Sequence, residues 1–256
     1  MHPVAIFVAT RWELAALRKA LPVHRQKTVD GLRCWVGQRG ESTYWLIQTG
    51  IGPEAAAAAA CSVMNPVRFA LAISTGLAGA LVPAEIGDLI IGTEISSVSY
   101  DDGWKRIADA VPCDSAAISS VRALAQQLGM MTRIGSVVSV PTVVSRAEDK
   151  QSIGRLTGAT ALDMESDALA RAAKDRAIPF LVIRTVSDLA NEDLPLDFNL
   201  FLRPTGWMSG LRMLIGRPST LIGLNKLRLQ SNLAVAKLTA VFSALSEVGF
   251  GLSPDR

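Results

Sequence analysis

The segment Ala161–Ala190, ALDMESDALARAAKDRAIPFLVIRTVSDLA, constrains the fold most, because one helical run lies between two strand-like runs. Within Glu165–Arg176, apolar residues recur at the spacing of one helical face, at Ala168, Leu169, Ala172 and Ala173. Pro179 stops this helix and opens the apolar run FLVI, which predicts a buried strand that ends near Asp188. The segment therefore predicts part of a wound α/β sheet.

Charged and hydroxyl side chains follow both predicted strands at their carboxyl ends. In wound α/β sheets, ligands bind outside these ends. Five side chains are therefore expected to converge at one rim: Asp163, Glu165, Arg184, Ser187 and Asp188. Three carboxylates beside an arginine and a hydroxyl suit an acid-assisted bond cleavage. Any single acid could instead favour a helix N-terminus or cap a turn, but the ordered set favours a site.

Four blocks of sequence carry a family resemblance. Besides Ala161–Ala190, they are VAIFVATRWELAALRKAL at Val4–Leu21, QTGIGPEAAAAAA at Gln48–Ala60, and ISTGLAGALVPAEIGDLIIG at Ile73–Gly92. With these blocks in this order, the chain resembles the nucleoside phosphorylase and nucleosidase family, above all the nucleosidases that act on methylthioadenosine and adenosylhomocysteine. The resemblance implies one α/β domain over residues 1–256, with three αβα layers and a mixed central sheet.

The resemblance also implies a reaction, the cleavage of a ribosyl N-glycosidic bond with adenine as the leaving group. Asp188 would protonate or hydrogen-bond N7 of the base, which near neutral pH requires burial or a neighbouring carboxylate. Glu165 would bind the ribose hydroxyls, and Met164 would pack on the sugar. Glu13 would orient the nucleophile, although the residues alone make it a first-turn glutamate that the helix dipole favours. Finally, Ser187 and Arg184 would hold Asp188 and the rim in place, beside Asp163.

Glycines next to predicted strands mark two further binding segments. Ile51 lies between Gly50 and Gly52, where the backbone can turn sharply towards a ligand. The glycine-rich run Thr75–Gly79, predicted as a loop after a strand at Leu71–Ser74, could cradle a ribose or an oxyanion. Its candidate contacts are Gly76, Leu77 and Ala78.

The nucleophile is left open between water and inorganic phosphate. Relatives that use phosphate place a hydroxyl residue near the position of Leu77, so leucine there and a glutamate at Glu13 favour water. Phosphate remains a candidate co-substrate, and no cofactor is expected. Where methylthioadenosine enzymes stack an aromatic ring on adenine, this chain has the aliphatic segment Ser139–Ser145, from which Thr142 and Val143 are expected to line the base.

The C-terminal region, 198–246, is basic and lacks Asp and Glu. Trp207–Ile215 has the pattern of a short amphipathic segment, which either contacts an anionic membrane surface, covers an apolar ligand, or packs as part of the closing helices. Leu221–Leu245 is predicted to be an ordinary helix with a core-facing stripe. Asp101–Arg106 and Val111–Ser115 are predicted to be surface loops.

These features resemble one subgroup, the hopanoid-associated phosphorylases, which implies that adenosylhopane is the substrate. The motif DMES, the continuation SDLANEDLPLDF at Ser187–Phe198 and the basic, apolar C-terminal region carry the likeness. Two alternatives remain. The chain could be a nucleosidase for methylthioadenosine or adenosylhomocysteine, or a noncatalytic nucleoside-binding or lipid-binding protein on the same fold.

Composition argues against several other classes of protein. With 256 residues, 49% of them hydrophobic, the chain can bury one sizeable core. The net charge of +3 comes largely from the C-terminal region and is not interleaved with aromatics, so nucleic-acid binding is not expected. The three cysteines and two histidines lack metal-ligand spacing, and no disulfide framework is indicated. No signal peptide or membrane span is apparent, so we expect a cytoplasmic protein that touches the inner membrane surface. The family resemblance implies at least a homodimer.

Overall fold

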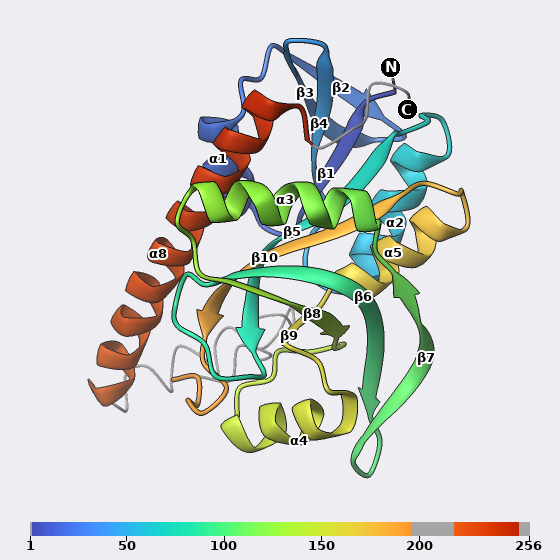
Figure 1. The fold of residues 1–256 in the computed structure, drawn as a ribbon. Helices are drawn as coiled ribbons and strands as arrows, with labels where there is room; N and C mark the ends of the chain where they lie inside the picture. Colours follow the sequence, from blue (N-terminus) through green and yellow to red (C-terminus); the bar gives the residue numbers. More distant parts are fainter. Residues whose placement is uncertain (1, 196–217, 251–256) are drawn as a thin grey trace.

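The computed structural model describes residues 2–195 and 218–250, which form one mixed sheet covered by helices on both faces (Figure 1). The strands are β1 (Val4–Val8), β2 (Arg25–Val29), β3 (Leu32–Arg39), β4 (Ser42–Gln48), β5 (Leu71–Ala80), β6 (Leu89–Tyr100), β7 (Trp104–Pro112), β8 (Thr132–Ser139), β9 (Ala161–Asp163) and β10 (Phe180–Asp188). The helices are α1 (Arg11–Ala20), α2 (Pro53–Met64), α3 (Ser115–Gln127), α4 (Ala147–Thr157), α5 (Ser166–Lys174) and α8 (Pro218–Val248).

The sheet contains parallel and antiparallel pairs, as the sequence predicts. The strand order is β10-β6-β8-β9-β5-β1-β4-β3-β2, and β7 pairs with β6 outside this path. β10 also pairs with β5, so that β5, β9, β8, β6 and β10 close into a ring. At one edge of this ring, Gly79 of β5 is paired with Asp188 of β10 and with Leu162 of β9, and Asp163 of β9 is paired with Ser139 of β8. The last residues of these four strands therefore lie together, although β8 and β9 run antiparallel to β5 and β10.

Alternation along the strands builds two cores, one on each face of the sheet. In β1, Ala5 and Phe7 pack into one core beneath α2 and α5, whereas Val4, Ile6 and Val8 pack into the other beneath α1, α3 and α8. Successive side chains of a strand point to opposite faces, so a strand buried on both faces reads as a continuous apolar run. This explains the run VAIFV and confirms the predicted three-layer αβα architecture.

The sequence-based boundaries are wrong in two places. The run Thr75–Gly79, predicted to be a loop, continues β5 to Ala80, because it pairs in register with β10. The stretch predicted as surface loops around Asp101–Arg106 contains a hairpin, in which β7 pairs with β6. Most side chains of β7 face solvent, which removes the apolar alternation by which a strand is identified.

The C-terminal helix agrees with its prediction. α8 includes the predicted Leu221–Leu245 helix, and its buried stripe contains Ala234, Leu238, Val241 and Leu245. The amphipathic segment predicted at Trp207–Ile215 lies outside the described residues. Among the helices that are described, none is long and apolar enough to cross a membrane.

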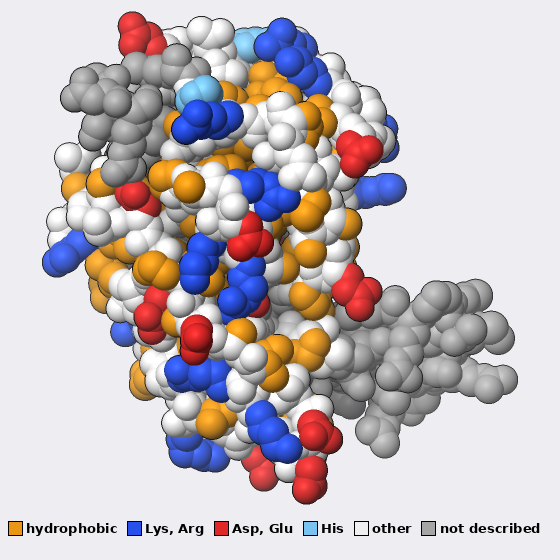
Figure 2. Space-filling view, turned by 90° about the vertical axis from the view of Figure 1, so that its right-hand side faces the viewer, with side chains coloured by type: hydrophobic (Ala, Val, Ile, Leu, Met, Phe, Trp, Pro, Cys, Tyr) orange, Lys and Arg blue, Asp and Glu red, His pale blue; other side chains and the backbone are white. Residues whose placement is uncertain are grey.

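Surface charge is mixed on the side of the molecule shown in Figure 2. Lysine and arginine side chains are interspersed there with aspartate and glutamate, and apolar side chains lie between them. The small positive net charge therefore does not form one continuous basic area on this face.

Candidate active site

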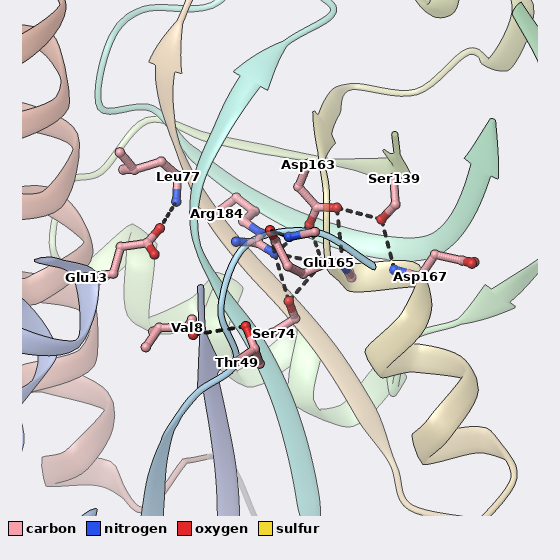
Figure 3. Close-up of polar contacts among 12 residues, drawn as sticks. Val8, Glu13, Thr49, Ser74, Leu77, Ser139, Asp163, Glu165, Asp167 and Arg184 are labelled. Atoms are coloured by element: carbon pink, nitrogen blue, oxygen red, sulfur yellow. Dashed lines mark hydrogen bonds and ion pairs between the residues drawn. The ribbon is translucent and has the colours of Figure 1, made fainter. Parts of the chain in front are cut away.

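Asp163 anchors the carboxyl end of β9 (Figure 3). Its Oδ1 accepts hydrogen bonds from Ser139 Oγ (2.6 Å) and from the backbone N–H of Ser166 (3.2 Å). Its Oδ2 accepts from Ser166 Oγ and lies 2.6 Å from Arg184 Nη2. With these donors from β8, α5 and β10, the carboxylate is saturated and only 5% of the residue is exposed.

Arg184 is buried in β10 beneath the same cluster. Its Nη2 donates to Ser74 Oγ (2.8 Å) and Ser166 Oγ (3.0 Å) in addition to Asp163. Its Nε has no hydrogen-bond partner among the described residues. Because a buried guanidinium is stable only when paired, Arg184 and Asp163 hold four strands and a helix together.

Glu165 is the N-cap of α5 and carries the second carboxylate of the predicted rim. Its Oε1 accepts from the N–H of Gly52 (2.9 Å), and its Oε2 lies 3.9 Å from Arg184 Nη2. Burial raises the pKa of Glu165 to about 7; the carboxylates of Asp163 and Glu13 add to this rise, whereas Arg184 and the Gly52 N–H oppose it. Near neutral pH, Glu165 therefore exists in both protonation states and can either donate to a hydroxyl or accept from one.

Glu13 occupies the first turn of α1, where it forms a capping box with Thr10. Its Oε2 accepts from the N–H and Oγ1 of Thr10, both at 2.8 Å, and its Oε1 accepts from the N–H of Leu77 at 3.0 Å. The carboxylate thus joins α1 to β5 (Figure 3). A Cβ at Gly76, where φ is +144°, would lie 2.3 Å from Glu13 Oε1 and 2.7 Å from Arg184 Nη1, so only glycine fits there.

Asp188 ends β10 and has fewer protein partners than Asp163. Its Oδ1 accepts from Ser187 Oγ (3.0 Å), and its Oδ2 accepts from Lys150 Nζ (2.6 Å). The Asp188 side chain is 16% exposed, whereas that of Lys150 is fully buried. Asp188 therefore reaches the cleft with part of its carboxylate accessible.

A cleft of about 160 Å³ brings most of the predicted residues together. Nine of them line it: Leu77, Ala78, Thr142, Val143, Asp163, Met164, Glu165, Ser187 and Asp188. Four predicted residues are outside this lining. Glu13 and Arg184 flank Gly76, next to the cleft wall formed by Leu77, whereas Ile51 is 48% exposed in the turn before α2.

The remaining cleft wall is aliphatic, with Val140, Val144, Leu162 and Leu194. A second cleft of about 120 Å³ shares Val140 and Met164 with the first. Its other lining residues are the apolar Pro53, Val98, Ile107 and Pro141 and the polar Ser97, Ser99, Ser139 and Asp167. The site thus combines a polar floor at the strand ends with an apolar extension past Met164. Such a combination is typical of small-molecule sites.

Sequence reasoning missed several residues that build the site. Lys150, the Gly52 N–H and the Ser166 hydroxyl contact the predicted acids but were not selected. The Ser74 hydroxyl, which contacts Arg184 and Ser166, was also missed. Lys150 and Ile153 form the buried face of α4 at i, i+3 spacing, but only the structure shows that this lysine is buried. Within residues 2–195 and 218–250, no group of three or more His, Cys, Asp or Glu side chains is arranged to hold a metal ion.

Comparisons with known proteins agree with this geometry. The family model described as "Phosphorylase superfamily" matches residues 3–203. A 5′-methylthioadenosine/S-adenosylhomocysteine nucleosidase of Staphylococcus aureus is 27% identical over 209 residues, which cover 78% of this chain and 92% of the relative.

Solved structures show the same fold. The Neisseria meningitidis 5′-methylthioadenosine/S-adenosylhomocysteine nucleosidase, in complex with methylthio-immucillin-A, has a TM-score of 0.76 at 20% identity and covers 97% of this chain and 100% of its own. A futalosine hydrolase mutant of Helicobacter pylori has a TM-score of 0.66 at 18% identity, over 73% of this chain and 89% of its own.

Proposed function

We propose, from the premise that the chain belongs to the phosphorylase superfamily, that it cleaves the N-glycosidic bond of an adenosine-type nucleoside and releases adenine. It is an enzyme of the N-ribosyl hydrolase or phosphorylase type. One observation carries the proposal. Asp188 and Glu165, from the ends of different elements, line one cleft together with Met164. A base and a ribose bound there would each meet one carboxyl group.

The chemistry follows from this placement. As the bond between C1′ and N9 breaks, its electron pair passes into the adenine ring and positive charge develops on the ribose. A proton is transferred to N7 through Asp188, so that the base leaves neutral rather than as an anion. Glu165 binds the ribose hydroxyls, and Met164 packs against the sugar.

Water is the nucleophile that the surroundings favour. Arg184, which lies 3.9 Å from Glu165, is already paired with Asp163 and two serine hydroxyls. Phosphate would lie near the carboxylates of Glu13 and Glu165, which repel it. Water is uncharged and is not repelled by these carboxylates. Glu13 Oε1, which accepts a hydrogen bond from the Leu77 N–H, can also accept one from water and so orient it.

We propose adenosylhopane as the substrate. The support comes from the subgroup resemblance and from an apolar surface between α1 and α8, where a hollow of about 340 Å³ is lined by Trp12, Leu224, Leu227 and Arg228, among others. Leu229 and Leu233 are exposed on α8. The clefts at the site are too small to enclose a pentacyclic lipid, so the substrate would lie with its adenosine in the cleft and its lipid outside.

The size of those clefts favours a second candidate substrate. Volumes of about 160 and 120 Å³ suit a short 5′ substituent that extends past Met164. The Staphylococcus aureus relative is a nucleosidase for methylthioadenosine and adenosylhomocysteine, whose 5′ groups are of this kind.

One assay separates these alternatives. The purified protein is incubated with detergent-solubilised adenosylhopane, methylthioadenosine or adenosylhomocysteine, with and without phosphate, and both adenine and the sugar product are identified. Adenosylhopane turnover without phosphate is expected. Ribose 1-phosphate products would establish phosphorolysis, and faster turnover of the soluble nucleosides would establish the second candidate. Release of no adenine from any of them would leave only a binding role.

A further inference from the structure

A fully buried lysine contacts the acid assigned to the leaving group. Lys150, on α4, donates from Nζ to Asp188 Oδ2 (2.6 Å) and to the carbonyl oxygens of Leu189 (2.9 Å) and Glu192 (3.2 Å). An ammonium group has three N–H donors and no acceptor, and here all three are used. This saturation is what allows a charged lysine to remain inside the protein.

This arrangement changes how a proton can reach the base. An aspartate that accepts from an ammonium is a carboxylate, which has no proton to give. Protonation of N7 through Asp188 therefore needs a proton from another group that contacts Asp188. The Lys150 ammonium is the group in direct contact, and its hydrogen bond to Oδ2 is short, as expected for a charge-assisted pair.

We propose that Lys150 is a positioning residue that supplies Asp188 with the proton for the departing adenine. This inference rests on the proposed function. As the C1′–N9 bond breaks, N7 takes a proton from Asp188 while Asp188 takes one from Lys150 Nζ. Asp188 ends as a carboxylate and Lys150 as a neutral amine. The proton lost by the attacking water returns to Lys150 through the partly exposed carboxylate of Asp188, so the sum is nucleoside plus water to adenine plus the free sugar.

Lysine suits this role better than arginine does. A buried lysine can release its proton, whereas a guanidinium keeps its charge in proteins.

Lys150 has a second role that must be separated from the first, because it also ties the chain after β10 through two carbonyls. Lys226 provides a matched control. Its Nζ contacts the same segment through Glu192 Oε2 (2.9 Å), but its side chain is 59% exposed and does not line the cleft. A loss that comes only from loosening this segment should therefore also follow from Lys226→Met.

The experiment compares leaving groups in the wild-type protein and in Lys150→Met, Lys150→Arg and Lys226→Met. One substrate is the adenine nucleoside turned over by the wild-type protein; the other is the 4-nitrophenyl riboside with the same 5′ group, whose leaving group needs no proton. We expect Lys150→Met to lose about 10²-fold or more in kcat on the nucleoside and only a few-fold on the riboside. Lys150→Arg should lose kcat on the nucleoside with KM nearly unchanged, and Lys226→Met should match the wild type.

Other outcomes overturn the inference. Equal losses on both substrates would make Lys150 a structural tether, and so would a Lys150→Arg protein as fast as the wild type on the nucleoside. Thermal melting of each variant reports folding independently. If Lys150→Met is unfolded, the comparison of Lys150→Arg with the wild type tests the inference instead. A wild-type protein that releases no adenine would overturn the proposed function itself, whereas the leaving-group comparison overturns only the role of Lys150.

Discussion

Asp163 and Asp188 end strands that reach the same cleft, but their surroundings differ. Asp163 accepts from two serines and contacts Arg184, and it is nearly inaccessible. Asp188 accepts from Ser187 and Lys150 and keeps part of its carboxylate exposed. A saturated carboxylate stabilises the fold, whereas one with accessible acceptor sites can meet a ligand. Asp163 therefore stabilises the fold and Asp188 can bind a ligand, although in the sequence both are simply acids that follow a strand.

The largest effect is expected for Asp188→Asn. Asparagine keeps the shape and can still accept from Lys150, but it cannot transfer a proton to N7. We expect adenine release to fall about 10³-fold, as is typical when general acid catalysis is lost. The measurement is single-turnover adenine release, with Asp101→Asn as the control because Asp101 is exposed, pairs with Lys105 and lines neither cleft. Nearly normal release by the Asp188 variant would remove this residue from the chemistry.

Asp163→Asn should act on stability instead. The change leaves buried Arg184 without its nearest carboxylate, and an unpaired buried charge is costly. We expect the free energy of unfolding to fall by about 3 kcal/mol, measured by urea denaturation. The comparison of the two aspartates would fail if this variant kept its stability but lost adenine release as strongly as Asp188→Asn.

The sequence predicts the strands and the helix that carry these acids, because the spacing of apolar residues indicates which faces are buried. The continuous apolar runs of β1 and β10 and the helical stripe of α5 place the strand ends, and with them Asp163, Glu165 and Asp188. Strand ends that share one side of a sheet must bring their following residues together.

Other features escape the sequence because they depend on partners far along the chain. Thr75–Gly79 has the composition of a loop, and only its pairing with β10 keeps it in a strand. Lys150 precedes Asp188 by 38 positions, and a lysine on a helix is ordinarily solvated. Asp163 also differs from Asp188 in having all its acceptor sites filled. This difference cannot be predicted from the sequence, because the donors come from segments that only the fold brings together.

Glu165 provides a pH test at the Asp163 end of the cleft. Its pKa is raised to about 7, chiefly by burial, from an ordinary value of 4.5. Between these values the folded protein holds a proton that the unfolded chain has lost, so this group's contribution to stability falls as pH rises from 4.5 to 7. Glu165→Gln removes this dependence.

We therefore expect the free energy of unfolding of Glu165→Gln, relative to the wild type, to increase by about 1–3 kcal/mol over this pH range. Urea denaturation of both proteins at several pH values gives the difference, in which the other titrating groups cancel. A difference that stays constant with pH would mean that Glu165 is not held in this way by burial.

The smallest effect is expected for Gly79→Ala, which perturbs the Asp188 end alone. A Cβ at Gly79 would lie 2.8 Å from Asp188 Oδ2 and 3.3 Å from Leu162 Cδ1, and the φ of this glycine is not in the left-handed region. The carboxylate must move, while the backbone need not. We expect a loss of stability of about 1 kcal/mol and a roughly tenfold loss in adenine release. Gly154→Ala on α4 is the control, since its Cβ would meet only Leu81, at 3.3 Å or more. If Gly79→Ala destabilised the protein as much as Asp163→Asn does, Asp188 would also be a structural anchor.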